Sequence, residues 1–135
     1  MAHWLVKSEP DVYSWGRLVA EKRAVWDGVR NHQAKKNLQA MRVGDTVLFY
    51  HSNVGKCVVG VCKVVKEAYP DPTAPDTPWV VVDVAPVAAL KRPVDLADIK
   101  AHPKLKNIGL VRQGRLSVMP VTAAEWATLT NLGGL

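Results

Sequence analysis

The sequence predicts a small α+β domain in which five or six strands form an open or closed β-barrel flanked by short helices. Short runs of β-branched and aromatic residues recur along the chain, with turn residues and short helical patterns between them. The longest run, Cys57–Val65, contains Gly60, which is typical of the bulge or bend that closes a small barrel. There is no internal repeat and no strand–helix–strand rhythm, so we expect one domain over residues 1–135.

The first predicted elements are a strand and a short helix. His3–Lys7 is rich in strand-forming residues, and Pro10 ends the run because proline cannot donate to a sheet. Ser14 has the position of an N-cap for a helix that ends near residue 21, with Leu18 and Val19 facing inward.

A second helix and a second strand follow. Asn31–Met41 predicts a helix because Ala34, Leu38 and Met41 recur at spacings of four and three. Thr46–His51 is rich in β-formers and is followed by turn residues, which predicts a strand that ends at residue 51.

The second half of the chain begins with the glycine-containing strand and ends with a capped helix. Thr122 and Glu125 have the spacing of a capping box, and Trp126 and Leu129 are expected to face the core. Between them the sequence predicts a proline-rich loop over Tyr69–Pro78, a strand over Trp79–Val87 with its even-numbered valines on one face, a helix over Asp95–Ala101 and a last strand over Leu116–Val121.

Cysteine usage and hydropathy indicate a cytoplasmic protein. Cys57 and Cys62 are five residues apart in one strand, so they point to opposite faces and cannot easily bridge each other. Unbridged thiols suit a reducing cytosol, and two cysteines without matching ligands do not indicate a zinc site. Met1–Lys7 is too short and polar for a signal peptide, and no apolar run could span a membrane. We expect a monomer without cofactor or metal.

The charge of the chain favours an anionic partner. Eighteen basic and twelve acidic residues give a net charge of +6. Seven basic and two acidic residues lie between positions 91 and 115, which leaves +5 in that segment. Such a density suits phosphate groups, although a solvated surface is the simpler alternative.

Polar and aromatic residues concentrate between positions 26 and 33. Trp26 offers a stacking platform for a nucleobase, and Asn31 and Gln33 carry the donors and acceptors that read a base edge. Arg30 either binds phosphate or pairs with Asp27. The structural alternative places Trp26 in the core.

A second polar group lies where two predicted strands end. In a regular strand Tyr50 and Ser52 point to one side and His51 to the other. A nucleophile–base pair is not favoured here because no acid has the spacing to orient His51. Ser8 follows Lys7 at the end of the first strand, where it either donates to a ligand or caps a turn.

Five short segments, in this order, resemble the EVE domain family. They are Lys7–Pro10, Trp26–Asn31, Gly44–Asp45 leading to Phe49–Ser52, Tyr69–Pro72 and Arg115–Val118. The resemblance extends from Trp4 to Trp126. It implies a PUA-like β-barrel with flanking helices and a pocket that receives a modified nucleobase, with cytosine derivatives among the ligands.

The residue types and the resemblance together predict the binding residues. Trp26, Asn31, Tyr50 and Ser8 are expected to border one pocket. The predicted ligand contacts are Lys7, Ser8, Trp26, Arg30, Asn31, His32, Gln33, Tyr50, His51, Ser52 and Ser117, and the predicted phosphate contacts are Lys35, Arg112 and Arg115. Two of these depart from the family, which usually has Tyr at position 32 and Arg at position 35. The loop between Tyr69 and Trp79 is also shorter than in many members.

Three functions agree with this pattern to different degrees. The favoured one is a non-catalytic reader of a modified base in DNA or RNA. The second is a general RNA-binding PUA-like domain without specificity for modification. The third, a nucleotide hydrolase, lacks support because the sequence shows no metal-ligand set, carboxylate pair or glycine-rich phosphate loop.

Overall fold

The computed structural model describes residues 1–135 and contains one six-stranded mixed sheet. The strand order is β2-β5-β4-β3-β1-β6, and only the β1–β3 pair is parallel. The strands are β1 (His3–Ser8), β2 (Ala24–Val25), β3 (Thr46–His51), β4 (Cys57–Pro70), β5 (Val80–Asp95) and β6 (Val118–Val121). The helices are α1 (Trp15–Glu21), α2 (His32–Ala40), α3 (Leu96–Ala101), the 3₁₀-helix η1 (Pro103–Leu105), α4 (Gly109–Arg112) and α5 (Ala123–Leu132).

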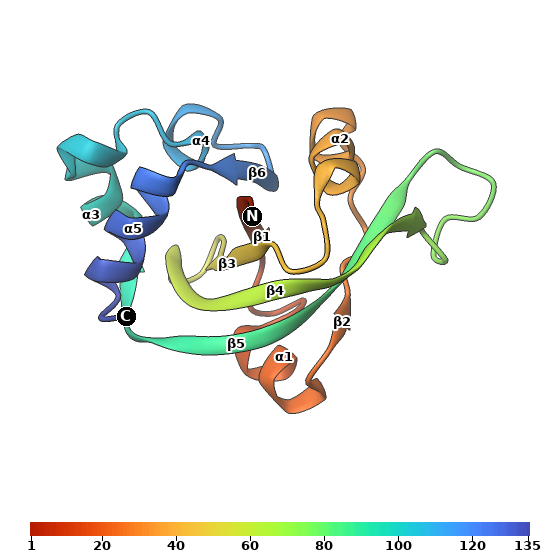
Figure 1. The fold of residues 1–135 in the computed structure, drawn as a ribbon, viewed down its shortest axis with the longest axis horizontal. Coiled ribbons are helices and arrows are strands. Elements are labelled where there is room, and N and C mark those ends of the chain that lie inside the picture. The colour runs from red at the N-terminus through yellow and green to blue at the C-terminus, as the bar shows by residue number, and fades with distance from the viewer.

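The sheet curves strongly but does not close. β2 and β6 form its two edges and do not pair with each other, although β4 and β5 curve around the core (Figure 1). Near the β6 edge, Asn37 Nδ2 of α2 donates to Val118 O at 2.7 Å, so a helix lies where a barrel would need a further strand. Of the two predicted alternatives the closed barrel is therefore wrong, whereas the α+β class and a sheet of six strands are confirmed.

Gly60 lies at an irregular point of β4, as its position in the sequence predicts. The β4–β5 register shifts between Val58 and Gly60, and the β3–β4 register shifts between Phe49 and Tyr50. The indole of Trp15 packs directly against Gly60, because a Cβ atom there would lie 2.5 Å from Trp15 Cζ2. The missing side chain therefore makes room for the first residue of α1.

The β4–β5 hairpin is longer than the sequence predicts. β4 continues to Pro70, beyond the predicted end at Val65, and β5 continues to Asp95, beyond Val87. Apolar–polar alternation fades in these extensions because much of them is exposed on both faces, so pairing with the other strand maintains them. The predicted loop is correspondingly confined to residues 71–79.

Side-chain caps begin the helices at the predicted residues. Ser14 accepts from Arg17 N, Asn31 accepts from Ala34 N, and Thr122 forms a full capping box with its partner in α5. The inward position predicted for Val19 is wrong, since its exposed fraction is 47%. No helix has both the length and the apolar character needed to cross a bilayer.

Three short elements escaped sequence prediction. β2 has only two residues, η1 three and α4 four. Segments this short contain about one period of a hydrophobic pattern, so no repeat can be recognised, and they depend on tertiary contacts.

The core is built around the ring of Phe49. This fully buried residue makes edge contacts with Trp26 at 5.4 Å and with Trp15 and His51 at 5.6 Å between ring centres. α5 covers a different part of the sheet, with Leu129 fully buried and Trp126, half-buried, stacked on His3. Both cysteines are buried and unbridged, as their spacing predicts.

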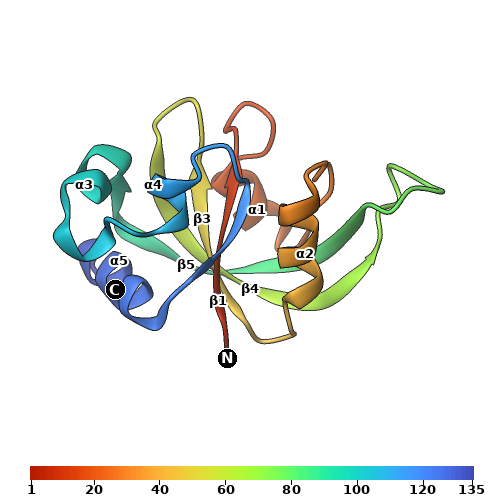
Figure 2. The same cartoon turned by 90° about the horizontal axis from the view of Figure 1, so that it is seen from above.

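Three loops meet at the carboxyl ends of β1 and β3 (Figure 2). Ser52 N donates to Ser8 O at 3.0 Å, which joins the loop after β3 to the end of β1. Lys7 N donates to Ser117 O at 2.9 Å, which brings in the loop after α4. The carboxyl end of a parallel strand pair is a common place for ligands.

The hairpin loop is held to the segment between β2 and α2 by the buried carboxylate of Asp71. It accepts from Gly28 N at 3.2 Å, Arg30 Nη1 at 2.9 Å, and Thr73 N and Oγ1 at 2.7 and 2.6 Å. Burial raises the pKa of Asp71, but the hydrogen bonds from Thr73, Arg30 and Gly28 outweigh burial and lower it to about 2.

Replacing Gly60 with alanine should lower the free energy of unfolding by about 1–3 kcal/mol, because the added methyl group overlaps the Trp15 indole. Gly114→Ala is the matched control, since apart from its chain neighbours no heavy atom lies within 4 Å of the place where its methyl group would be. Urea denaturation measures both changes. Equal losses in the two variants would contradict the close packing of α1 on β4.

Replacing Asp71 with asparagine should lower the free energy of unfolding by about 1–3 kcal/mol at pH 7, because an amide nitrogen takes the place of one of two buried oxygens that both accept hydrogen bonds. In the native protein this stabilisation is complete above the ordinary pKa of 3.8 and is lost as the pH falls through about 2. Denaturation at pH 7 and between pH 4 and pH 2 tests both points. Asp27→Asn, at the exposed carboxylate, should change little.

Candidate functional site

Lys7 and Tyr50 lie side by side on one face of the sheet. They are register partners in the parallel β1–β3 pair, and the Lys7 ammonium lies 5.9 Å from the Tyr50 ring centre. Lys7 Nζ donates to Gly114 O at 2.7 Å, which ties it to the loop after α4. Burial lowers the pKa of Lys7. An ammonium has three donors, so Lys7 keeps capacity for a ligand.

The hydroxyl of Tyr50 is uncommitted. Tyr50 is only 3% exposed and its hydroxyl makes no hydrogen bond within the protein, yet no fully buried polar atom lacks a partner. The hydroxyl therefore keeps some contact with solvent, and we call the site formed by the Lys7 and Tyr50 side chains the recess. Burial and then the nearby Cys57 raise the pKa of Tyr50, so the phenol remains protonated and can donate or accept.

Ser8, His51 and Trp26 belong to the other face of the sheet. Ser8 Oγ donates to Tyr13 O at 2.7 Å, which is the turn-capping alternative. His51 Nε2 accepts from Trp15 N at 3.0 Å, and burial lowers the pKa of His51. Trp26 is 7% exposed, so its ring is a core side chain with little surface free for stacking. All three side chains contribute to the fold.

The four residues predicted to border one pocket do not share a face. Trp26 packs on Phe49, and the next residue in β3, Tyr50, points to the opposite side. Ser8 lies on the Trp26 side, since it pairs with His51 in the parallel register. Asn31 is at the start of α2, where its Oδ1 accepts from the helix. Two surface clefts of about 480 and 450 Å³ border α3 and include none of the predicted residues.

Arg30 pairs with Asp71 and not with Asp27, so the alternative based on sequence proximity is wrong. Arg30 also lies 5.9 Å from the ring centre of Trp79. Asp27 is exposed and forms no ion pair. The guanidinium is thus partly neutralised, which weakens its candidacy as a phosphate ligand.

The first turn of α2 presents exposed polar side chains. His32 packs against Trp79 with 4.8 Å between ring centres and a tilt of 34°. Gln33 Nε2 donates to Gln113 Oε1 at 3.0 Å, which connects α2 to the loop after α4. Sequence reasoning missed both Trp79 and Gln113. The signal that could have found Trp79 is its place directly after a proline-rich loop, where the sequence pattern predicts only the start of a strand.

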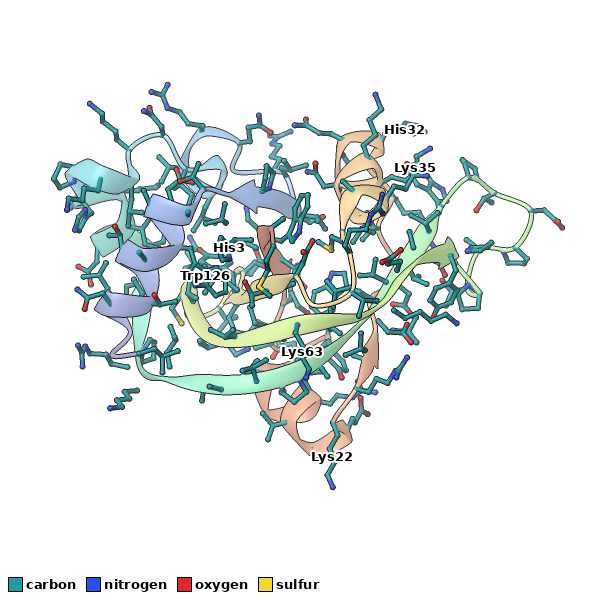
Figure 3. The ribbon with its side chains drawn as sticks, viewed as in Figure 1. His3, Lys22, His32, Lys35, Lys63 and Trp126 are labelled. Atoms are coloured by element: carbon teal, nitrogen blue, oxygen red, sulfur yellow. The ribbon has the colours of Figure 1, made fainter.

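The predicted phosphate ligands differ in their freedom. Arg112 is engaged in its own loop, donating to Lys106 O at 3.2 Å and to Asn107 Oδ1 at 2.7 Å. Arg115 and Lys35 form no ion pair. Figure 3 shows Lys35 beside His32 on α2, far from Lys22, the residue that follows α1.

The remaining predicted contacts are near the same loops. Ser117 is half-buried and gives its carbonyl to β1, and Ser52 is half-buried beside the end of β1. No group of three or more His, Cys, Asp or Glu side chains is arranged to hold a metal ion. Only three ion pairs form in a chain with eighteen basic residues, so most cationic side chains are available to an anionic partner.

Comparison with known proteins assigns the family. The family profile of the EVE domain matches residues 2–132. Human thymocyte nuclear protein 1 is 36% identical over 97% of this chain and 73% of its own length. The crystal structure of protein Atu2648 from Agrobacterium tumefaciens is 46% identical with a TM-score of 0.97, covering 100% of this chain and 94% of the other. Human THYN1, crystallised in complex with DNA containing 5-methylcytosine, is 36% identical with a TM-score of 0.93, covering 100% and 99%. The chain belongs to the EVE domain family.

Proposed function

We propose that this protein is a non-catalytic nucleic-acid-binding module that reads a modified base, with methylated cytosine in DNA as its first candidate. The observation that carries this proposal is the complex of human THYN1 with DNA containing 5-methylcytosine, because that protein matches the whole of this chain with a TM-score of 0.93. A match of this extent supports a shared mode of binding as well as a shared fold.

The distribution of committed and uncommitted polar groups supports a binding site at the carboxyl ends of β1 and β3. Ser8, Asn31 and His51 each use a side-chain donor or acceptor for a hydrogen bond to a backbone group. Tyr50 keeps its hydroxyl and Lys7 keeps two donors at the same place. A polar, half-buried recess with unpaired donors suits a flat ligand that offers acceptors along one edge.

A reader does not need proton transfer, and the histidine nearest the recess is poorly placed for it. The Nε2 atom of His51 is occupied by Trp15 N and its ring contacts Phe49. A general base must reach the proton that it abstracts, so this histidine favours a structural role.

The proposal includes a cellular context. Both thiols are buried and unbridged, which suits a reducing compartment such as the cytoplasm. We infer that the protein works there as a monomer, which light scattering of the purified chain would test.

Oligonucleotides of one sequence should separate modified-base reading from general binding. A single-stranded DNA with 5-methylcytosine should bind about tenfold more tightly than the same strand with cytosine, since one methyl group in an apolar contact contributes about 1–3 kcal/mol. Fluorescence anisotropy measures both affinities, and an RNA of the same sequence is the third arm. Equal affinity for methylated and plain strands would contradict base reading and favour a general nucleic-acid-binding domain.

The Tyr50 hydroxyl provides the matched variant for that experiment. Tyr50→Phe should weaken binding by about three- to tenfold, the loss expected for one hydrogen bond, without changing stability. Tyr13→Phe is the control, since the Tyr13 hydroxyl is already bound to Glu21 at the surface. Trp26→Ala is unsuitable, because removing a buried indole should itself destabilise the fold by about 3–5 kcal/mol.

Salt should weaken the binding of any oligonucleotide if exposed cations contact phosphates. The logarithm of the association constant should fall linearly with the logarithm of salt concentration. Arg115→Gln should reduce the magnitude of the slope by about one and weaken methylated and plain strands alike. Lys63→Gln, on an exposed part of β4, is the charge-matched control. A slope unchanged by Arg115→Gln would remove Arg115 from the interface.

A further inference from the structure

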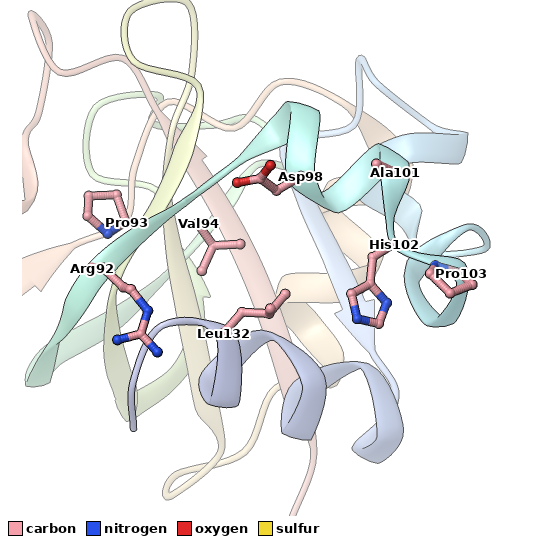
Figure 4. Close-up of a pocket in the computed structure, with 8 residues that line it drawn as sticks. All are labelled: Arg92, Pro93, Val94, Asp98, Ala101, His102, Pro103 and Leu132. Carbon is pink, nitrogen blue, oxygen red and sulfur yellow. The ribbon is translucent and has the colours of Figure 1, made fainter.

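The basic segment between residues 91 and 115 has a structural feature that base reading does not use. The chain there passes from β5 through α3 and η1, and together with α5 these elements enclose a cleft of about 480 Å³ (Figure 4). This volume is within the range of small-molecule sites. The net charge of +5 is spread along the whole segment, and the cleft lining itself carries one arginine and one aspartate.

Two donors of the cleft have no acidic partner. Arg92 belongs to none of the three ion pairs, and its backbone N–H is bonded to Gly133 O, which positions it beside the end of α5. His102 Nδ1 accepts from Lys104 N at 3.1 Å. The hydrogen of the neutral ring is therefore on Nε2, which is left free to donate.

The base of the cleft is apolar. Val94 is 3% exposed, and the half-buried Leu132 of α5 lies opposite it. Arg92 and His102 stand on either side of these two residues in Figure 4. An apolar floor between two donors suits a ligand with an apolar flat body and an anionic group.

One acceptor completes the lining. Asp98 is the only acidic residue in the cleft, is exposed and forms no ion pair. A carboxylate accepts from amino groups, as it does when it reads the exocyclic amine of cytosine.

We propose that this cleft is a second binding site, which takes one nucleoside monophosphate unit, either free or within a strand. Arg92 holds the phosphate, and Val94 and Leu132 support the sugar and base. On the far side His102 Nε2 donates to a ring acceptor of the base, and Asp98 accepts from its exocyclic amine. Arginine suits the phosphate because its planar fork donates two parallel hydrogen bonds. The site is separate from the recess of Lys7 and Tyr50 and does not depend on base reading.

A titration of the full chain with cytidine 5′-monophosphate, followed by amide NMR, tests the proposal. The amide signals of Val94, Asp98 and Ala101 should shift and saturate. Cytidine and inorganic phosphate should each bind about tenfold more weakly, because each lacks one half of the recognised groups. Uridine 5′-monophosphate, which lacks the exocyclic amine, should bind several-fold more weakly. Inorganic phosphate binding as tightly as the nucleotide would overturn the proposal and leave only diffuse attraction of anions.

Variants locate the binding in the cleft. Arg92→Gln should weaken the nucleotide about tenfold or more, since it removes hydrogen bonds to a charged group, and His102→Gln should weaken it about three- to tenfold, since it removes one hydrogen bond to the base. Lys91→Gln removes the same charge next to the cleft without removing a lining group, and should have little effect. Ala101→Phe keeps every polar group but fills the space from an exposed position, and should abolish the shifts. If Lys91→Gln and Arg92→Gln weaken nucleotide binding equally, the affinity depends on net charge alone, and the proposal is overturned.

A single-stranded hexanucleotide distinguishes the source of the ligand. If it shifts the same three amides at lower concentration than the mononucleotide, the cleft holds part of a strand. If it leaves them unshifted, the cleft takes free nucleotides. Arg92→Gln should preserve the ratio of affinities for methylated and plain strands, and Tyr50→Phe should preserve the mononucleotide shifts. The experiment can therefore contradict the proposed base reading without contradicting the proposed second site, and the reverse.

Discussion

The buried carboxylate of Asp71 is the interaction on which the arrangement of the candidate surface depends. Its donors come from the turn before α2, from Arg30 and from the hairpin loop itself, so one side chain sets three segments relative to one another. His32 reaches Trp79 only because that loop is held beside α2. A carboxylate that accepts four hydrogen bonds can remain ionised in a buried position. The same hydrogen bonds lower the pKa of Asp71.

The parallel pairing of β1 with β3 has a similar effect at the centre of the sheet. It places Lys7 beside Tyr50 on one face and Ser8 beside His51 on the other. The first pair retains hydrogen-bonding capacity, whereas the second is used to anchor the turn and the start of α1. Neighbouring residues of one short motif therefore have different roles, and the alternation of side chains along a strand is the reason.

The positive charge of the protein is also divided in space. Lys35 lies on α2 and Arg115 in the loop after α4, whereas Arg92 lies near the end of β5 beside a cleft of its own. A polynucleotide carries charge along its whole length, so separated cationic sites can engage one strand at different phosphates. The proposed base-reading site and the proposed second site therefore involve different cationic side chains.

The sequence by itself determined what depends on neighbours along the chain. Ser14, Asn31 and Thr122 begin helices as predicted, because a cap bonds a backbone group only two or three residues away. The buried face of α2 also followed from spacing alone. The open sheet, the core position of Trp26 and the partner of Arg30 were decided by tertiary structure, since residues 41 positions apart are adjacent only after folding. Closure of a sheet and the freedom of a hydroxyl such as that of Tyr50 depend on every element packed nearby, and no local pattern in the sequence encodes them.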